Sequence, residues 1–105
     1  MSDLKGKVAL ITGASSGIGA ATAIVFARLG AKLSLTGRNE VNLKLTSDEC
    51  VRVQPADTEQ PLMVLAELTS EADVINLVDA TIKKFGRLDI LVNNCLLYTS
   101  PSPRD

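Results

Sequence analysis

The sequence predicts an α/β protein built on part of a doubly wound parallel sheet, with four strands in the order 3-2-1-4 and three helices. Three observations lead to this fold class. Short runs of β-forming residues alternate with longer segments of helical period along the chain. None of the connections carries a hairpin signal, so crossovers between parallel strands are expected. A glycine-rich turn joins the first apolar run to the first helical segment.

The first strand and the first helix flank this turn. Residues 7–12, KVALIT, are typical of a strand buried on both faces. The turn follows at 13–19, and residues 18–29 then have a helical period of apolar side chains. That stripe consists of Ile18, Ala21, Val25 and Leu29. Gly30 stands where a glycine would cap the C-terminus of the helix.

The second strand, second helix and third strand follow in order. Residues 32–36 form a short strand pattern, and a helix is predicted from Asn39, a plausible N-cap, to about Cys50. Residues 51–61 hold two prolines and several polar residues, so a loop is expected there. The apolar run at 62–66 predicts the third strand.

The third helix and fourth strand complete the predicted sheet. Ser70, with Asp73 three residues later, resembles a capping box, although Glu or Gln is usual at the second position. The helix that it opens ends at Gly86. One face of this helix carries Val74, Val78, Ile82 and Phe85. Residues 88–92 predict the fourth strand.

Composition narrows the class of function. The chain has 105 residues, the size of one domain, and its 11 basic and 12 acidic residues predict no binding to nucleic acid or a membrane surface. Histidine is absent, which excludes histidine catalysis and histidine metal ligands within this sequence. Two cysteines match no zinc or redox motif, and the first apolar run is too short for a signal peptide or a membrane span. We expect a cytoplasmic protein without a metal site.

The turn at 13–19 is the strongest candidate for chemistry. A helix N-terminus offers unpaired N–H groups, and glycine lets an anion such as phosphate approach the backbone. The spacing differs from both the G-x-G-x-x-G fingerprint and the P-loop. The alternative is a tight turn without a ligand, which the surrounding strand–helix–strand pattern makes the weaker interpretation.

Two motifs then resemble those of the short-chain dehydrogenases/reductases. Thr12-Gly13-x-x-x-Gly17-x-Gly19 is similar to the cofactor motif of that family, and Leu91-Val92-Asn93-Asn94 stands where the family has Asn-Asn-Ala-Gly. The resemblance covers about residues 4–94. It implies a Rossmann-type fold and redox chemistry between alcohols and carbonyls that depends on NAD or NADP.

The residues after the second strand favour NADP over NAD. In dinucleotide folds an acid near this point binds the ribose 2′-OH, whereas an arginine accepts a 2′-phosphate. Here the strand ends Thr36-Gly37-Arg38-Asn39, without an acid. Arg38 could pair with a phosphate through two hydrogen bonds. The alternative is that Arg38 is solvated or paired with Glu40.

The remaining cofactor contacts follow from the family resemblance. Glu67 and Leu68 stand where the family contacts the adenine, with Glu in place of the usual Asp. Asn94 matches a residue near the adenine ribose, whereas Asn93 has at least as strong a structural interpretation. The predicted cofactor-binding residues are Gly13, Ser15, Ser16, Gly17, Ile18, Gly19, Arg38, Glu67, Leu68 and Asn94.

No catalytic residue is predicted in this sequence. The family uses Tyr-x-x-x-Lys with a Ser upstream, but the only tyrosine is Tyr98, with Ser102 four positions later. Residues 95–105 depart from the family pattern, and Cys95 is not expected to be a nucleophile without histidine. We expect residues 1–94 to be the N-terminal part of the dinucleotide domain, 95–105 to be an unstructured, non-native tail, and the chain as given to be inactive.

The function predicted for the intact enzyme is hydride transfer between NADP(H) and a small carbonyl or alcohol substrate, of 3-oxoacyl type or another ketone. The resemblance implies that this enzyme is a homo-oligomer. Two alternatives stay open: a non-catalytic nucleotide-binding module, and a different doubly wound enzyme such as a methyltransferase.

Overall fold

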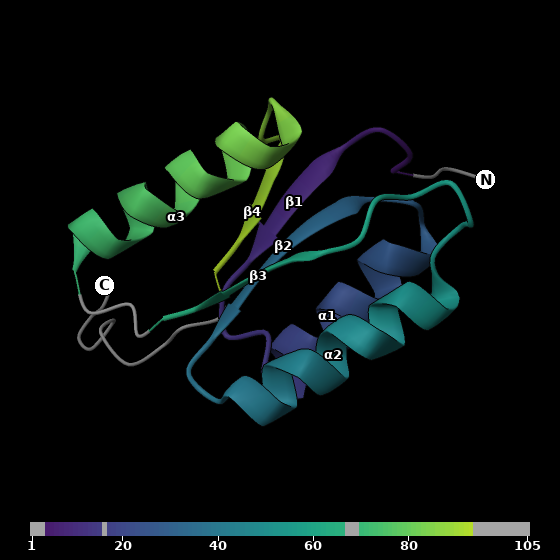
Figure 1. Ribbon diagram of the computed structural model, residues 1–105, viewed down its shortest axis with the longest axis horizontal. Helices are drawn as coiled ribbons and strands as arrows, with labels where there is room; N and C mark the ends of the chain where they lie inside the picture. The colour runs from purple at the N-terminus through teal and green to yellow at the C-terminus, as the bar shows by residue number, and fades with distance from the viewer. Residues whose placement is uncertain (1–3, 16, 67–69, 94–105) are drawn as a thin grey trace, which may run out of the picture.

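The computed structural model describes residues 4–15, 17–66 and 70–93. The elements are β1 Val8–Ile11, α1 Gly17–Arg28, β2 Lys32–Gly37, α2 Glu40–Val53, β3 Leu62–Leu65, α3 Glu71–Phe85 and β4 Ile90–Val92. The strands form one parallel sheet in the order β3-β2-β1-β4. Helices α1 and α2 cover one face of this sheet and α3 lies on the other (Figure 1). The predicted fold class and strand order are confirmed.

Strand β1 is fully buried, as its apolar run predicts. All its residues have no exposed surface. Ala9 pairs with Leu33 and Ile11 with Leu35 in the register with β2, and these four side chains belong to the core beneath α1 and α2. Because side chains alternate along a strand, Val8 and Leu10 point toward the side of α3.

Helix α1 faces the core with small side chains and not with its predicted stripe. The buried residues are Gly19, Ala23 and Ala27, whereas Ile18 is 77% and Val25 47% exposed. The predicted stripe is therefore not the inward face of this helix, and the large side chains packed partly buried against the core are Ile24 and Phe26. Small residues let the helix approach its neighbours closely, and burial here follows from that approach.

The end of α1 follows the predicted glycine cap. The N–H of Ala31 donates to the carbonyl of Phe26 and that of Gly30 to the carbonyl of Ala27, which is the Schellman pattern. Gly30 has φ of +94°. Because L side chains rarely adopt this φ, glycine is the residue suited to this position.

Helix α2 begins as predicted but ends later. Asn39 is the N-cap, and its side chain accepts a hydrogen bond from the backbone N–H of Asn42. The helix continues to Val53, so the predicted loop from residue 51 starts too early. Gln54 has extended backbone angles and precedes Pro55. A proline disfavours helical angles in the residue before it, which places the end of α2 here.

Helix α3 has the predicted caps and a shifted inner face. The Ser70 side chain accepts from the N–H of Asp73, and Gly86 caps the other end with φ of +84°. Its buried residues are Leu77 and Thr81. The predicted stripe lies to one side of this face: Val74, Val78 and Phe85 are half-buried, and Ile82 is exposed.

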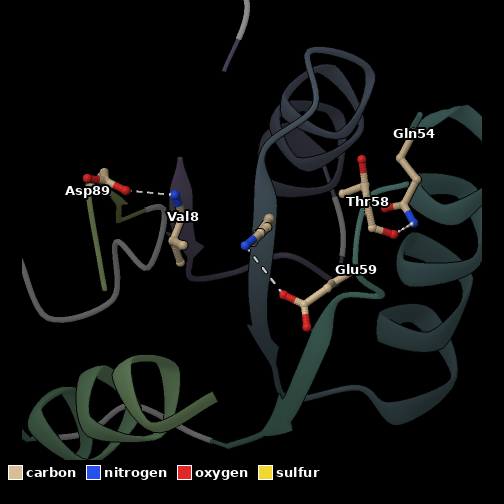
Figure 2. A network of polar contacts seen from close by, with 6 residues as sticks. Val8, Gln54, Thr58, Glu59 and Asp89 are labelled. Carbon is tan, nitrogen blue, oxygen red and sulfur yellow. Dashed lines mark hydrogen bonds and ion pairs between the residues drawn. The ribbon is translucent and has the colours of Figure 1, made fainter. Parts of the chain in front are cut away.

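Strand β4 begins at Ile90, two residues later than predicted. Just before it, the Asp89 side chain, and not a backbone carbonyl, accepts the hydrogen bond from the Val8 N–H. The Asp89 backbone N–H donates to the Val8 carbonyl, and its carboxylate Oδ2 accepts from the Val8 N–H at 2.9 Å (Figure 2). Oδ1 accepts from Arg87 at 2.8 Å. The Arg87 guanidinium and then the Val8 N–H hold the pKa of Asp89 below its usual range. The carboxylate thus fixes the start of β4 against β1.

Candidate functional site

The candidate site begins at the carboxyl end of β1. Thr12 is buried, and the chain then turns sharply into α1. Gly13 and Gly17 have φ of +63° and +58°, in the left-handed region that glycine adopts readily. The two glycines therefore allow a short connection that brings the N-terminus of α1 directly over the strand end.

The turn is closely packed at Gly19 and open to the outside at Gly17. A Cβ at position 19 would lie 2.0 Å from the Gly13 carbonyl oxygen, so Gly19 leaves no room for a side chain. At Gly17, by contrast, a Cβ would meet nothing within 4 Å. The N–H of Ala14 donates to the Thr36 carbonyl at 2.8 Å, which attaches the turn to β2. The backbone is thereby held in place, with its outer side accessible to a ligand.

The N-terminus of α1 suits an anion. The first N–H groups of a helix have no partner within the helix and carry a partial positive charge. No acidic side chain lies in the first turn of α1 to oppose an anion. The exposed Ile18 side chain adds an apolar surface beside these N–H groups.

A basic side chain follows β2 at the same edge of the sheet. Gly37, the last residue of β2, is buried, and Arg38 directly after it is exposed. Because Ala14 is bonded to Thr36, the tip of β2 and the turn are neighbours. The structure therefore brings an arginine to the side of a turn that suits an anion.

A polar link closes the other side of the turn. The Thr12 hydroxyl donates to Asn93 Oδ1 at 2.8 Å, and the Thr12 N–H donates to the Val92 carbonyl at 2.9 Å. These bonds join the carboxyl ends of β1 and β4. The hydrogen bond to Thr12 gives Asn93 a structural role, which is one of the two roles that the sequence left open for it.

The predicted site residues that the structure describes lie at one edge of the sheet, after β1 and β2. They are Gly13, Ser15, Gly17, Ile18, Gly19 and Arg38. The predicted site residues outside the described part of the chain are Ser16, Glu67, Leu68 and Asn94. Residues 95–105, with Cys95 and Tyr98, are also outside it, so the predicted domain boundary stays a prediction.

Sequence reasoning missed Gly37. A Cβ there would lie 2.8 Å from both the Cβ and the Oγ of Ser15, so the strand tip and the turn are in close contact. The only signal in the sequence was that Gly37 ends the strand pattern, immediately before Arg38.

The described residues contain neither a candidate membrane span nor a candidate cluster of metal ligands. No helix there combines the length and the apolar character that crossing a membrane requires. No group of three or more His, Cys, Asp or Glu side chains comes together there as metal ligands would.

The fold and the turn define a Rossmann-like α/β protein, with the glycine-rich turn after β1 and the sheet order β3-β2-β1-β4. The chain belongs to the short chain dehydrogenase family, whose family model matches residues 7–102. It is thus a member of an oxidoreductase family that uses nicotinamide cofactors.

Similar proteins cover nearly all of this chain. The short chain dehydrogenase/reductase astE of Aspergillus oryzae is 41% identical over 100 residues, which are 95% of this chain and 37% of that protein. The NADPH-dependent aldehyde reductase 1, chloroplastic, of Arabidopsis thaliana is 37% identical over 94 residues, or 87% of this chain and 33% of the relative. The apo-form crystal structure of glucose dehydrogenase of Caenorhabditis elegans has a TM-score of 0.77 at 42% identity, covering 87% of this chain and 38% of that one. The chain therefore spans well under half the length of these proteins.

Proposed function

We propose that the chain is the cofactor-binding part of an NADP-dependent short-chain oxidoreductase. The observation that carries the proposal is the turn from Gly13 to Gly19, which is tightly packed against β2 on one side and open on the other. A pyrophosphate would rest on the N–H groups of the turn and of the first turn of α1. No acidic side chain in that first turn opposes it.

Arg38 supports NADP as the cofactor. It is exposed and follows the buried Gly37 at the tip of β2, beside the turn. A guanidinium there could donate two hydrogen bonds to a 2′-phosphate, and residues 36–39, where the strand ends, include no carboxylate that would prefer a 2′-OH. The name of the Arabidopsis relative, which specifies NADPH, agrees with this choice. The family uses both NAD and NADP, so the choice depends on Arg38.

The rest of the proposal follows the family. Glu67 and Leu68 would contact the adenine and Asn94 would lie near its ribose. The bound nicotinamide would supply or accept a hydride, and the substrate would be a small carbonyl or alcohol, of 3-oxoacyl type or another ketone. We extend the proposal to a cytoplasmic, homo-oligomeric whole protein.

Titration of the 105-residue chain with NADPH and with NADH tests the cofactor. Hydrogen bonds to a charged group contribute about 1.5–3 kcal/mol, so Arg38→Ala should weaken NADPH binding about tenfold or more. NADH lacks the phosphate, and its binding should change little.

Arg28→Ala is the matched control. Arg28 is also exposed and basic, but it lies in the last turn of α1, at the opposite end of that helix from the turn. Its loss should leave both affinities nearly unchanged. Equal losses of NADPH and NADH affinity in Arg38→Ala would contradict the assignment of the 2′-phosphate. A folded chain that binds neither nucleotide would overturn the proposed function.

A further inference from the structure

The basic side chains gather at one end of the sheet, where the strands begin and the helices end (Figure 1). Eight of the ten lysine and arginine side chains in the described part of the chain come from this end. Four of them precede or begin strands: Lys5, Lys7, Lys32 and Arg87. The other four lie in the last turns of the helices: Arg28 of α1, Arg52 of α2, and Lys83 and Lys84 of α3. These eight residues are called the basic end below.

Hydrogen bonds hold the segments of the basic end together. The Leu4 N–H donates to the Leu29 carbonyl, and the Lys32 N–H donates to the Lys7 carbonyl, each at 2.8 Å. These two bonds attach the N-terminal segment to the connection between α1 and β2. The charge of Lys7 also helps to lower the pKa of Asp89, which places Lys7 beside the connection between α3 and β4. The basic side chains therefore stand on a fixed surface.

The acidic side chains at this end do not neutralise it. There are four in the described part, and each forms an ion pair: Glu49 with Arg52, Asp57 with Lys5, Glu59 with Lys32, and Asp89 with Arg87. Lys7, Arg28, Lys83 and Lys84 are exposed, and none of them forms an ion pair with a described residue. The other described residues include two basic and five acidic side chains. The balanced charge of the whole chain thus conceals an uneven distribution.

Neither the helix dipoles nor the proposed cofactor accounts for the whole basic end. A basic side chain in the last turn of a helix interacts favourably with the dipole, but four of the eight residues lie outside the helices. The candidate cofactor site lies at the opposite end of the sheet, after β1 and β2. The basic end would therefore serve another anionic group, and its role does not depend on the proposed function.

We propose that the basic end is a docking surface for an acidic, extended segment of a partner protein. Its charges come from separate segments of the chain, so a small anion would reach only a few of them, whereas a row of carboxylates would reach several. Charge complementarity of this kind speeds the encounter and selects the partner. The aromatic rings of the described part, Phe26 and Phe85, are half-buried, so this part offers no fully exposed ring on which nucleic-acid bases would stack.

A fluorescein-labelled peptide of about ten glutamates tests the proposal by fluorescence anisotropy with the 105-residue chain. Lys7→Gln, Lys83→Gln and Lys84→Gln each remove one charge that has no ion-pair partner among the described residues, and each should weaken binding about two- to fivefold. The triple variant should lose about tenfold or more. Binding should be largely lost in about 1 M NaCl, where the screening length is only about 3 Å.

Lys44→Gln is the matched control, because it removes the same charge from an exposed lysine of α2 outside the basic end, paired with Asp48 at 3.2 Å. It should leave the peptide affinity nearly unchanged. Thermal melting followed by circular dichroism checks that every variant is folded.

An equal loss in Lys44→Gln, or no binding of the peptide by the folded chain at low salt, would overturn the proposal. Tighter binding to single-stranded DNA of equal charge, or to phosphatidylserine vesicles, would also overturn it, because the basic end would then suit a nucleic acid or a membrane surface. A folded chain that binds the peptide but neither NADPH nor NADH would support this proposal and overturn only the proposed function.

Discussion

Thr81 on α3 and Ser34 on β2 form a buried polar link between helix and sheet. Neither residue has exposed surface, and their hydroxyl oxygens share a hydrogen bond of 2.8 Å. The Thr81 hydroxyl also lies 2.9 Å from the Leu77 carbonyl oxygen, to which it can donate. A hydroxyl has one proton, so Ser34 supplies the proton of the other bond when Thr81 donates to Leu77.

Removing the two hydroxyls singly and together should give strongly non-additive losses. Thr81→Val keeps the shape but leaves the Ser34 hydroxyl buried without this partner, and we expect a loss of about 2 kcal/mol in the free energy of unfolding. Ser34→Ala should lose about 1 kcal/mol, because Thr81 keeps its bond to Leu77. The double variant leaves neither hydroxyl unpaired and should lose about 1 kcal/mol, well short of the ~3 kcal/mol that additivity predicts.

Urea unfolding followed by far-ultraviolet circular dichroism measures these losses. For a domain of this size, 1 kcal/mol corresponds to roughly 4–8 °C in melting temperature. Thr22→Val is the matched control, since the partly exposed Thr22 hydroxyl donates to the Ile18 carbonyl at 2.7 Å within α1 alone. That variant should stay within about 0.5 kcal/mol of the wild type. Additive losses at positions 34 and 81, or a Thr22→Val loss as large as that of Thr81→Val, would show that the two buried hydroxyls do not stabilise the fold as a pair.

Three further predictions concern single residues. The pKa of Asp89 is held low by Arg87 and the Val8 N–H, so the contribution of its carboxylate to stability is present near neutral pH and is lost as the pH falls below about 4. Asp89→Asn should therefore be less stable than the wild type at pH 7. A difference in the free energy of unfolding that does not shrink in acid would contradict this. Burial raises the pKa of the Cys50 thiol to about 12, so alkylation mapped by mass spectrometry at pH 8 should be slow until urea unfolds the chain. Gly19→Ala places a Cβ 2.0 Å from a turn carbonyl and should lower stability by about 1–3 kcal/mol or more in urea unfolding, whereas a variant as stable as the wild type would disprove the close packing of the turn.

The secondary structure could be predicted because its signals are local. Ser70 and Asn39 cap helices through side-chain oxygens only three residues from the N–H groups that they accept from. Gly30 and Gly86 end α1 and α3 because glycine readily adopts the positive φ found at each helix end. That requirement involves only the last turn of the helix, so it can be predicted from neighbouring residues. The late end of α2 also has a local cause, Pro55, but the prediction ended the helix before reaching it.

The inward faces of the helices could not be predicted from apolar period alone. On α1 the stripe residues Ile18 and Val25 are exposed, while Ala23 and Ala27 are buried. The large side chains that pack against the core, Ile24 and Phe26, lie outside that stripe and are only partly buried. Which side of a helix is buried depends on how close its axis comes to the sheet and to the next helix. Small residues permit a close approach, so they can form the buried face of a helix. A hydrophobicity pattern that gives most weight to large side chains predicts a different face.

The order of elements and the glycine turn of the candidate site could be predicted because each depends on residues adjacent in the chain. The parallel sheet was predicted indirectly, from the alternation of strands and helices without hairpin signals. The side-chain contacts between distant segments are seen only in the folded chain. Thr81 meets Ser34 from 47 positions away, and the Asp89 carboxylate takes the Val8 N–H from 81 positions away. The approach of Gly37 to Ser15 belongs to the same class. Such contacts depend on how strands and helices pack together in space, and spacing along one chain does not encode that distance.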